Sequence, residues 1–133
     1  MSEELTRYLE GFWTKATAAG LSARKPGANW VAMAPLVRGS HVSLSVARHQ
    51  IQVNLNNEDD GDRAKYLHLF ADRGAVEAAI GEGLSWEKKD GRKKTAIRAT
   101  REEGYADGNW DEQHGWAIAM IKAFEASFGA RLR

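Results

Sequence analysis

Seven basic residues lie close together in one short stretch of this 133-residue chain. Within the stretch, Asp90-Gly91 is a dipeptide that favours a hairpin turn, so the surrounding lysines and arginines are expected to project from a two-stranded ribbon. Cations clustered on a ribbon can neutralise nucleic-acid phosphates, and affinity rises with the number of phosphates contacted. The seven residues are Lys88, Lys89, Arg92, Lys93, Lys94, Arg98 and Arg101.

The first functional hypothesis is therefore accessory binding of DNA or RNA by this hairpin. Arg24 and Lys25 would extend the basic surface. Lysines on an edge hairpin also prevent aggregation, and this alternative stays open. The chain has 19 Lys and Arg against 18 Asp and Glu, so its overall charge indicates no partner. The residues assigned to nucleic-acid binding are Lys89, Arg92, Lys93, Lys94 and Arg98.

Polar and apolar side chains alternate in two neighbouring segments, residues 41–46 and 50–55. Strict alternation predicts a β-hairpin with one face on a core and one face in solvent. The polar face carries hydroxyls and amides, which suits either an ordinary solvated surface or a hydrogen-bonding site. The second hypothesis is a protein-interaction or self-association module that uses a sheet edge or the polar residues Ser43, Ser45, Gln52 and Asn54.

No residue pattern indicates a catalytic, cofactor or metal site. The chain has no cysteine, which excludes disulfides and thiolate chemistry, and its four histidines lack the i, i+4 spacing of a helical metal site. The acidic segment 56–62 does not match a calcium loop, and Asp60 or Asp62 is instead expected to cap the following helix. An enzyme is therefore disfavoured, and we expect no catalytic residue, no metal and no cofactor.

Hydrophobic periodicity predicts three helices, starting near Ser2, Arg63 and Asn109 and ending near Gly20, Gly81 and Gly129. The middle helix is expected to bend or break near residues 72–74, and Asn109 with Glu112 is expected to form a capping box. Strands are predicted over about 29–36, 41–46, 50–55, 84–88 and 95–99.

The resulting order, α-β-β-β-α-β-β-α, predicts a single α+β domain over residues 1–133. Its sheet would be mainly antiparallel, with about five strands covered by helices. No apolar run approaches the roughly 20 residues that a membrane helix needs. The N-terminus also lacks the apolar segment of a signal peptide, so we expect a cytoplasmic protein without a membrane partner.

The order of these elements and the tryptophans in them resemble a known family. The chain is similar, over almost its whole length, to the bacterial domain-of-unknown-function family four-two-six-eight. The resemblance implies this α+β fold and no established catalytic residue. Members are often the C-terminal part of longer proteins, some with restriction-endonuclease-like regions, which implies an association with restriction systems. The motifs are Phe12-Trp13, Arg24-Lys25-Pro26, Asn29-Trp30, Val76-Glu77, Ile80-Gly81 and Leu84-Ser85-Trp86-Glu87.

Overall fold

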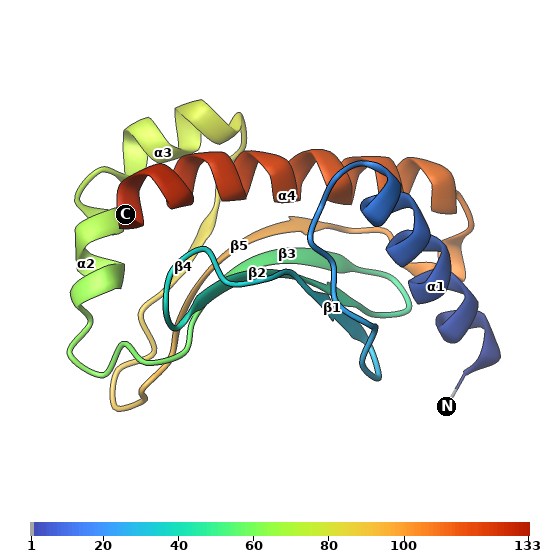
Figure 1. The fold of residues 1–133 in the computed structure, drawn as a ribbon, viewed down its shortest axis with the longest axis horizontal. Coiled ribbons are helices and arrows are strands. Elements are labelled where there is room, and N and C mark those ends of the chain that lie inside the picture. Colours follow the sequence, from blue (N-terminus) through green and yellow to red (C-terminus); the bar gives the residue numbers. More distant parts are fainter. Residues whose placement is uncertain (1) are drawn as a thin grey trace.

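The structure, a computed structural model, describes residues 2–133. A curved sheet lies beneath a layer of helices, with the longest helix running across it (Figure 1). The elements in chain order are α1 (Glu3–Ala18), β1 (Trp30–Ala32), β2 (Ser40–Val46), β3 (Ile51–Asn57), α2 (Ala64–Phe70), α3 (Arg73–Ile80), β4 (Ser85–Glu87), β5 (Thr95–Arg101), the short 3₁₀ helix η1 (Tyr105–Asp107) and α4 (Trp110–Leu132).

The five strands form one sheet in the order β1-β2-β3-β5-β4, and every neighbouring pair is antiparallel. This confirms the predicted α+β fold class and its antiparallel sheet. Figure 1 shows the helices on one side of the sheet only, with α4 across its middle, α1 at one end, and α2 and α3 at the other. The core lies between these layers, where alternate residues of β2 and β3, such as Leu44 and Leu55, are fully buried.

Local sequence signals explain most helix ends. The Ser2 hydroxyl accepts a hydrogen bond from the backbone N–H of Leu5, 3.2 Å away, and α1 ends just before Gly20, whose φ of +89° suits glycine. The predicted break in the middle helix is confirmed, because α2 and α3 are separate helices. Gly81 ends α3 in the left-handed conformation.

Three boundaries differ from the sequence prediction. Strand β1 is shorter than expected and ends at Ala32, because the chain then bends at Leu36, whose N–H donates to the carbonyl of Ser40. Helix α4 continues past Gly129 to Leu132. The side chain of Asn109 does not cap α4, since its amide donates to Glu103 and Glu112 instead.

The connection between β4 and β5 is also longer than the tight turn that Asp90-Gly91 suggested. It comprises residues 88–94. Its backbone is held by another segment, because the N–H of Asp60 donates to the carbonyl of Lys93 at 2.6 Å and Arg63 donates to the carbonyl of Lys89. None of the helices within residues 2–133 is long and apolar enough to span a membrane.

Candidate binding surfaces

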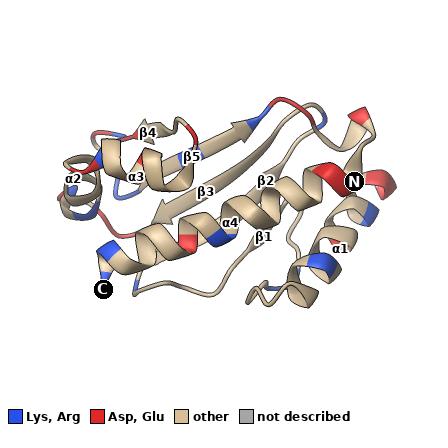
Figure 2. Cartoon of the chain, turned by 90° about the horizontal axis from the view of Figure 1, so that it is seen from above, with Lys and Arg blue, Asp and Glu red and all other residues tan. Residues whose placement is uncertain are grey.

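The side of the sheet opposite the helices is an open face. Successive side chains of a strand point to opposite faces, so the strand register defines which residues share it. They form three rows across the sheet. Strands β1, β2 and β3 contain no Lys, Arg, Asp or Glu, so their ribbons are tan in Figure 2. The open face consists of Trp30, Ala32, His41, Ser43, Ser45, Gln52, Asn54, Asn56, Ser85, Glu87, Ala96, Arg98 and Thr100.

Side chains on the open face are hydrogen-bonded to one another. The amide nitrogen of Asn54 donates to the hydroxyls of Ser43 and Ser45, at 3.3 and 2.9 Å. Its carbonyl oxygen accepts from Arg98, at 2.8 Å. Gln52 donates to Thr100 at 3.2 Å, so the bonds cross three strands. Because their partners are each other, these groups hold the face in one arrangement without water or ligand.

The four residues predicted to bind a partner all lie on this face, but they differ in their exposure to solvent. Asn54 is only 1% exposed and Ser43 is also buried. Ser45 and Gln52 are half-buried. A partner would therefore contact the more exposed side chains of this face. Ser43 and Asn54 would hold their neighbours in place through hydrogen bonds.

The open face carries little charge. Its two ionic groups, Arg98 and Glu87, form a salt bridge of 2.6 Å with each other. Burial lowers the pKa of His41, and the nearby cations Arg24 and Lys94 add to this against an opposing effect of Glu58, so His41 is neutral at neutral pH. The face is consequently a polar surface of nearly zero net charge.

Trp30 is the large apolar side chain exposed on the open face, at 47%. Two hollows lie along the same edge of the sheet. One, of about 240 Å³, is lined by residues that include Ala32 and His41, and the other, of about 160 Å³, by residues that include Ser45 and Gln52. An exposed indole beside shallow hollows is the kind of feature that anchors protein interfaces.

The basic residues predicted to bind nucleic acid do not form one free cationic cluster. Lys89 pairs with Glu87 at 3.8 Å and Lys94 with Glu58 at 3.0 Å, while Arg98 lies on the open face, paired with Glu87. Lys88 likewise pairs with Asp90, at 3.6 Å. Phosphates would have to displace these carboxylates, which lowers the gain from each contact.

Arg92 and Lys93 differ from the other basic residues of the 88–94 loop. Both are exposed, and neither forms an ion pair with any residue between positions 2 and 133. These two residues are the part of the predicted nucleic-acid site that remains available to phosphate.

Two buried residues outside the predicted binding sites, Arg63 and Asp60, hold this loop. Arg63 is 7% exposed, and its guanidinium donates to the carbonyls of Asp60 (2.7 Å) and Lys89. The carboxylate of Asp60 accepts from the N–H groups of Lys65 and Tyr66, at 2.9 and 3.0 Å, and from the Thr95 hydroxyl at 2.7 Å. The expectation that Asp60 caps the following helix is thus confirmed. The hydrogen bond between Asp60 and Thr95 of β5 joins residues that are 35 positions apart, so no local sequence pattern predicts it.

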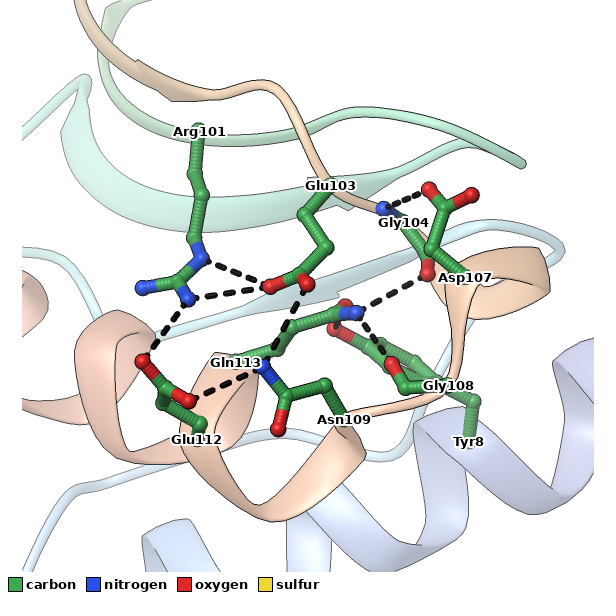
Figure 3. A network of polar contacts seen from close by, with 9 residues as sticks. All are labelled: Tyr8, Arg101, Glu103, Gly104, Asp107, Gly108, Asn109, Glu112 and Gln113. Carbon is green, nitrogen blue, oxygen red and sulfur yellow. Dashed lines mark hydrogen bonds and ion pairs between the residues drawn. The ribbon is translucent and has the colours of Figure 1, made fainter.

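A dense polar network joins α1, η1 and α4 (Figure 3). The Tyr8 hydroxyl donates to the Gln113 carbonyl oxygen at 2.7 Å, and the Gln113 amide donates to the carbonyls of Gly104 and Gly108 at 2.9 and 2.7 Å. Burial raises the pKa of Tyr8, so the phenol stays protonated. All of these groups are satisfied inside the protein, which indicates a structural role.

His114 is the remaining buried ionisable group of interest. Its Nδ1 lies 3.0 Å from the Nζ of Lys15, and its Nε2 has no hydrogen-bond partner among residues 2–133. Burial, with a further contribution from Lys15, lowers its pKa to about 4. Within those residues no group of three or more acidic or histidine side chains is arranged to hold a metal ion. The cluster of His114, Lys15 and Asp111 lines neither of the two hollows described above.

Comparison with known structures supports the fold. The crystal structure of YbjN, a putative transcription regulator from E. coli, superposes with a TM-score of 0.54. The two share 13% sequence identity, and the match covers 92% of this chain and 86% of that chain. At this identity the similarity concerns the fold alone. No curated protein matches the sequence.

A family model also matches almost the whole chain. The model described as "Domain of unknown function (DUF4268)" matches residues 7–132. This confirms the resemblance seen in the order of the sequence motifs. Since the match spans almost the entire chain, the protein belongs to the DUF4268 family.

Proposed function

We propose that this protein is a non-catalytic interaction module that binds a protein partner through the open face of its sheet. The observation that carries the proposal is Trp30, an indole 47% exposed on a face that is otherwise polar, preorganised and nearly uncharged. Interface centres are poor in Lys, Asp and Glu and rich in Trp and Arg, which are the properties of this face. Arg98, held by Asn54 and Glu87, is the second anchor.

Preorganisation favours binding at this face. A regular β-sheet loses little conformational freedom when a partner covers it, and the side chains of this face are already fixed by mutual hydrogen bonds. Binding energy is then concentrated in the anchors, so replacing one anchor should cost far more than replacing an ordinary surface residue.

The test compares Trp30→Ala with Leu67→Ala. Leu67 on α2 is 49% exposed and serves as a matched control away from the sheet. Proteins captured by the wild type would be identified by mass spectrometry, purified and titrated calorimetrically against both variants. We expect Trp30→Ala to weaken the interaction at least tenfold and Leu67→Ala to leave it unchanged. Equal affinity of all three proteins would contradict the proposal.

The partner could also be a second copy of the chain. Sedimentation velocity of the purified wild type over a range of concentrations distinguishes this case. A dimer that Trp30→Ala dissociates identifies the open face as a self-association surface. If the wild type is monomeric at every concentration, the partner is to be sought among other proteins.

Nucleic-acid binding by the 88–94 loop is a second candidate function, which the exposed and unpaired Arg92 and Lys93 favour. The similar structure of YbjN is described as that of a putative transcription regulator, which is consistent with this candidate. Fluorescence anisotropy with labelled oligonucleotides, at about 50 and 200 mM salt, tests it because phosphate binding weakens steeply over that range.

The double substitution Arg92→Glu with Lys93→Glu should abolish salt-sensitive binding. Lys122→Glu is a control, because Lys122 is exposed on α4, far along the chain from the loop. Binding that persists in the double variant would exclude the loop as the nucleic-acid site.

A further inference from the structure

A groove of about 350 Å³ lies between α1 and the segment that follows it. This segment, residues 21–29, is called the connector. Leu9, Glu10 and Trp13 contribute the α1 wall, and Lys25, Pro26 and Ala28 contribute the connector wall. None of the residues that line the groove belongs to the open sheet face or to the 88–94 loop, so a ligand site here is additional to the proposed interaction surface.

Both walls of the groove are fixed by hydrogen bonds. The connector lies along the outer edge of β1, where the N–H of Arg24 donates to the carbonyl of Ala32 at 2.8 Å and the N–H of Gly27 to that of Trp30 at 2.9 Å. The indole N–H of Trp13 donates to the carbonyl of Ala23 at 3.2 Å, which ties α1 to the connector. The groove is therefore already formed in the absence of a ligand.

Gly27 is required for this arrangement. A Cβ atom at this position would lie 2.2 Å from the indole ring of Trp30, closer than real contacts allow. The Trp30 ring packs directly on the connector backbone and supports the connector wall. Glycine is thus selected here by the close approach of the ring.

The lining of the groove matches that of small-molecule sites, which are mostly apolar with a few polar groups. Leu9 is buried, and Trp13 and Pro26 are half-buried. Because the indole N–H of Trp13 is already bonded to Ala23, Trp13 offers the groove an apolar aromatic surface. The volume lies at the lower end of the range for ligand pockets, about 300–1,000 Å³, and suits a small ligand.

The two walls carry opposite charges. Glu10 stands on the α1 wall and Lys25 on the connector wall, and both are exposed. Neither forms an ion pair within residues 2–133, and they do not pair with each other. A ligand that complements them carries an ammonium group and a carboxylate beside an apolar body.

We propose that this groove binds a free α-amino acid with an aromatic or large aliphatic side chain. Its ammonium group faces Glu10, its carboxylate faces Lys25, and its side chain packs against Trp13 and Pro26. No bond is made or broken in this binding.

Three ligands separate the charge contacts. L-phenylalanine carries both charges, 3-phenylpropionate lacks the ammonium, and L-phenylalaninamide lacks the carboxylate. Titration of each ligand into ¹⁵N-labelled protein, followed by NMR, gives both affinity and location. We expect L-phenylalanine to bind more tightly than either analogue by roughly two- to fivefold, the value of one exposed charge pair.

Two conservative variants test each contact. Glu10→Gln should weaken L-phenylalanine and leave 3-phenylpropionate unaffected, because that ligand has no ammonium to lose. Lys25→Gln should weaken L-phenylalanine and leave L-phenylalaninamide unaffected. The same-charge controls are Glu4→Gln on α1 and Lys122→Gln on α4, which should bind all three ligands as the wild type does.

Three outcomes would overturn the inference. One is the absence of saturable L-phenylalanine binding up to its solubility limit. Another is binding that neither Glu10→Gln nor Lys25→Gln weakens. The third is binding of an internal phenylalanine, tested as N-acetyl-phenylalanine-amide, with an affinity equal to that of the free amino acid, which would identify a peptide groove instead.

Discussion

At the scale of single residues, buried polar groups determine which parts of this protein are rigid. Gln113 uses both ends of its amide, one accepting from Tyr8 and the other donating to two glycine carbonyls. The Nε of Arg63 is one exception, with no hydrogen-bond partner among residues 2–133, and the other is the Nε2 of His114. The His114 ring packs against the rings of Tyr8 and Phe12, with centroids 4.5 and 5.9 Å away.

His114 should make the protein less stable at mildly acidic pH. Its pKa is lowered to about 4 in the folded protein and is about 6.5 when unfolded, so the unfolded chain binds more protons between these values. The free energy of unfolding should therefore fall by on the order of 1–2 kcal/mol as the pH decreases from 7 to 5. Urea unfolding at several pH values measures this change.

The variant His114→Gln should flatten this pH dependence, because glutamine cannot take up the proton. His68→Gln, at an exposed position on α2, should retain the wild-type slope. Identical slopes for the wild type and His114→Gln would show that other groups cause the effect.

At the scale of elements, the 88–94 loop is a fixed surface that depends on a distant arginine. Arg63 binds the carbonyls of Asp60 and Lys89 with two different nitrogens of one guanidinium. It also lies 4.0 Å from the carboxylate of Asp90. Arg92 and Lys93 are therefore presented on a supported loop, although the loop has no regular secondary structure.

Replacing Arg63 with lysine should loosen this loop selectively. A lysine ammonium is compact and cannot reproduce the planar guanidinium that reaches both carbonyls. Hydrogen exchange of the Arg92 amide, which donates to Lys89 at 3.1 Å, should accelerate, while amides of β3 keep their protection. Arg73→Lys on α3 is the matched control. Unchanged exchange at Arg92 would mean that the loop is held by its other contacts.

At the scale of the whole molecule, one face of the sheet supplies stability and the other remains available for binding. The helices lie on the same side of the sheet (Figure 1), and the residues of β2, β3 and β5 that belong to the hydrophobic core are packed beneath them. The opposite face is stabilised by polar contacts among its own side chains.

Neighbouring residues of β3 should show this division in their effect on stability. Leu55→Ala removes a fully buried side chain and should cost about 2–5 kcal/mol, since the rigid core cannot fill the cavity. Asn56→Ala changes the open face and should cost no more than about 1 kcal/mol. Urea unfolding of both variants tests the prediction, and equal losses would contradict it.

Much of the fold could be predicted because its signals are local. Alternation in residues 41–55 identified the central hairpin, and Ser2, Gly20 and Gly81 marked helix ends. The candidate sites were less predictable. Sequence places Lys89, Lys94 and Arg98 in a basic cluster, whereas their carboxylate partners Glu58 and Glu87 become neighbours only through strand pairing and the packing of the loop.

The sequence by itself determined the element order, the antiparallel sheet and the polar character of one sheet face, because each follows from side chains near one another along the chain. The tertiary structure decided which polar groups already have hydrogen-bond or ion-pair partners within the protein. It buried Arg63 beneath the loop, joined Asn54 to Arg98, and left Trp30 exposed on the open face. These outcomes depend on distances between segments far apart in the chain, and charge or polarity along the sequence does not specify such distances.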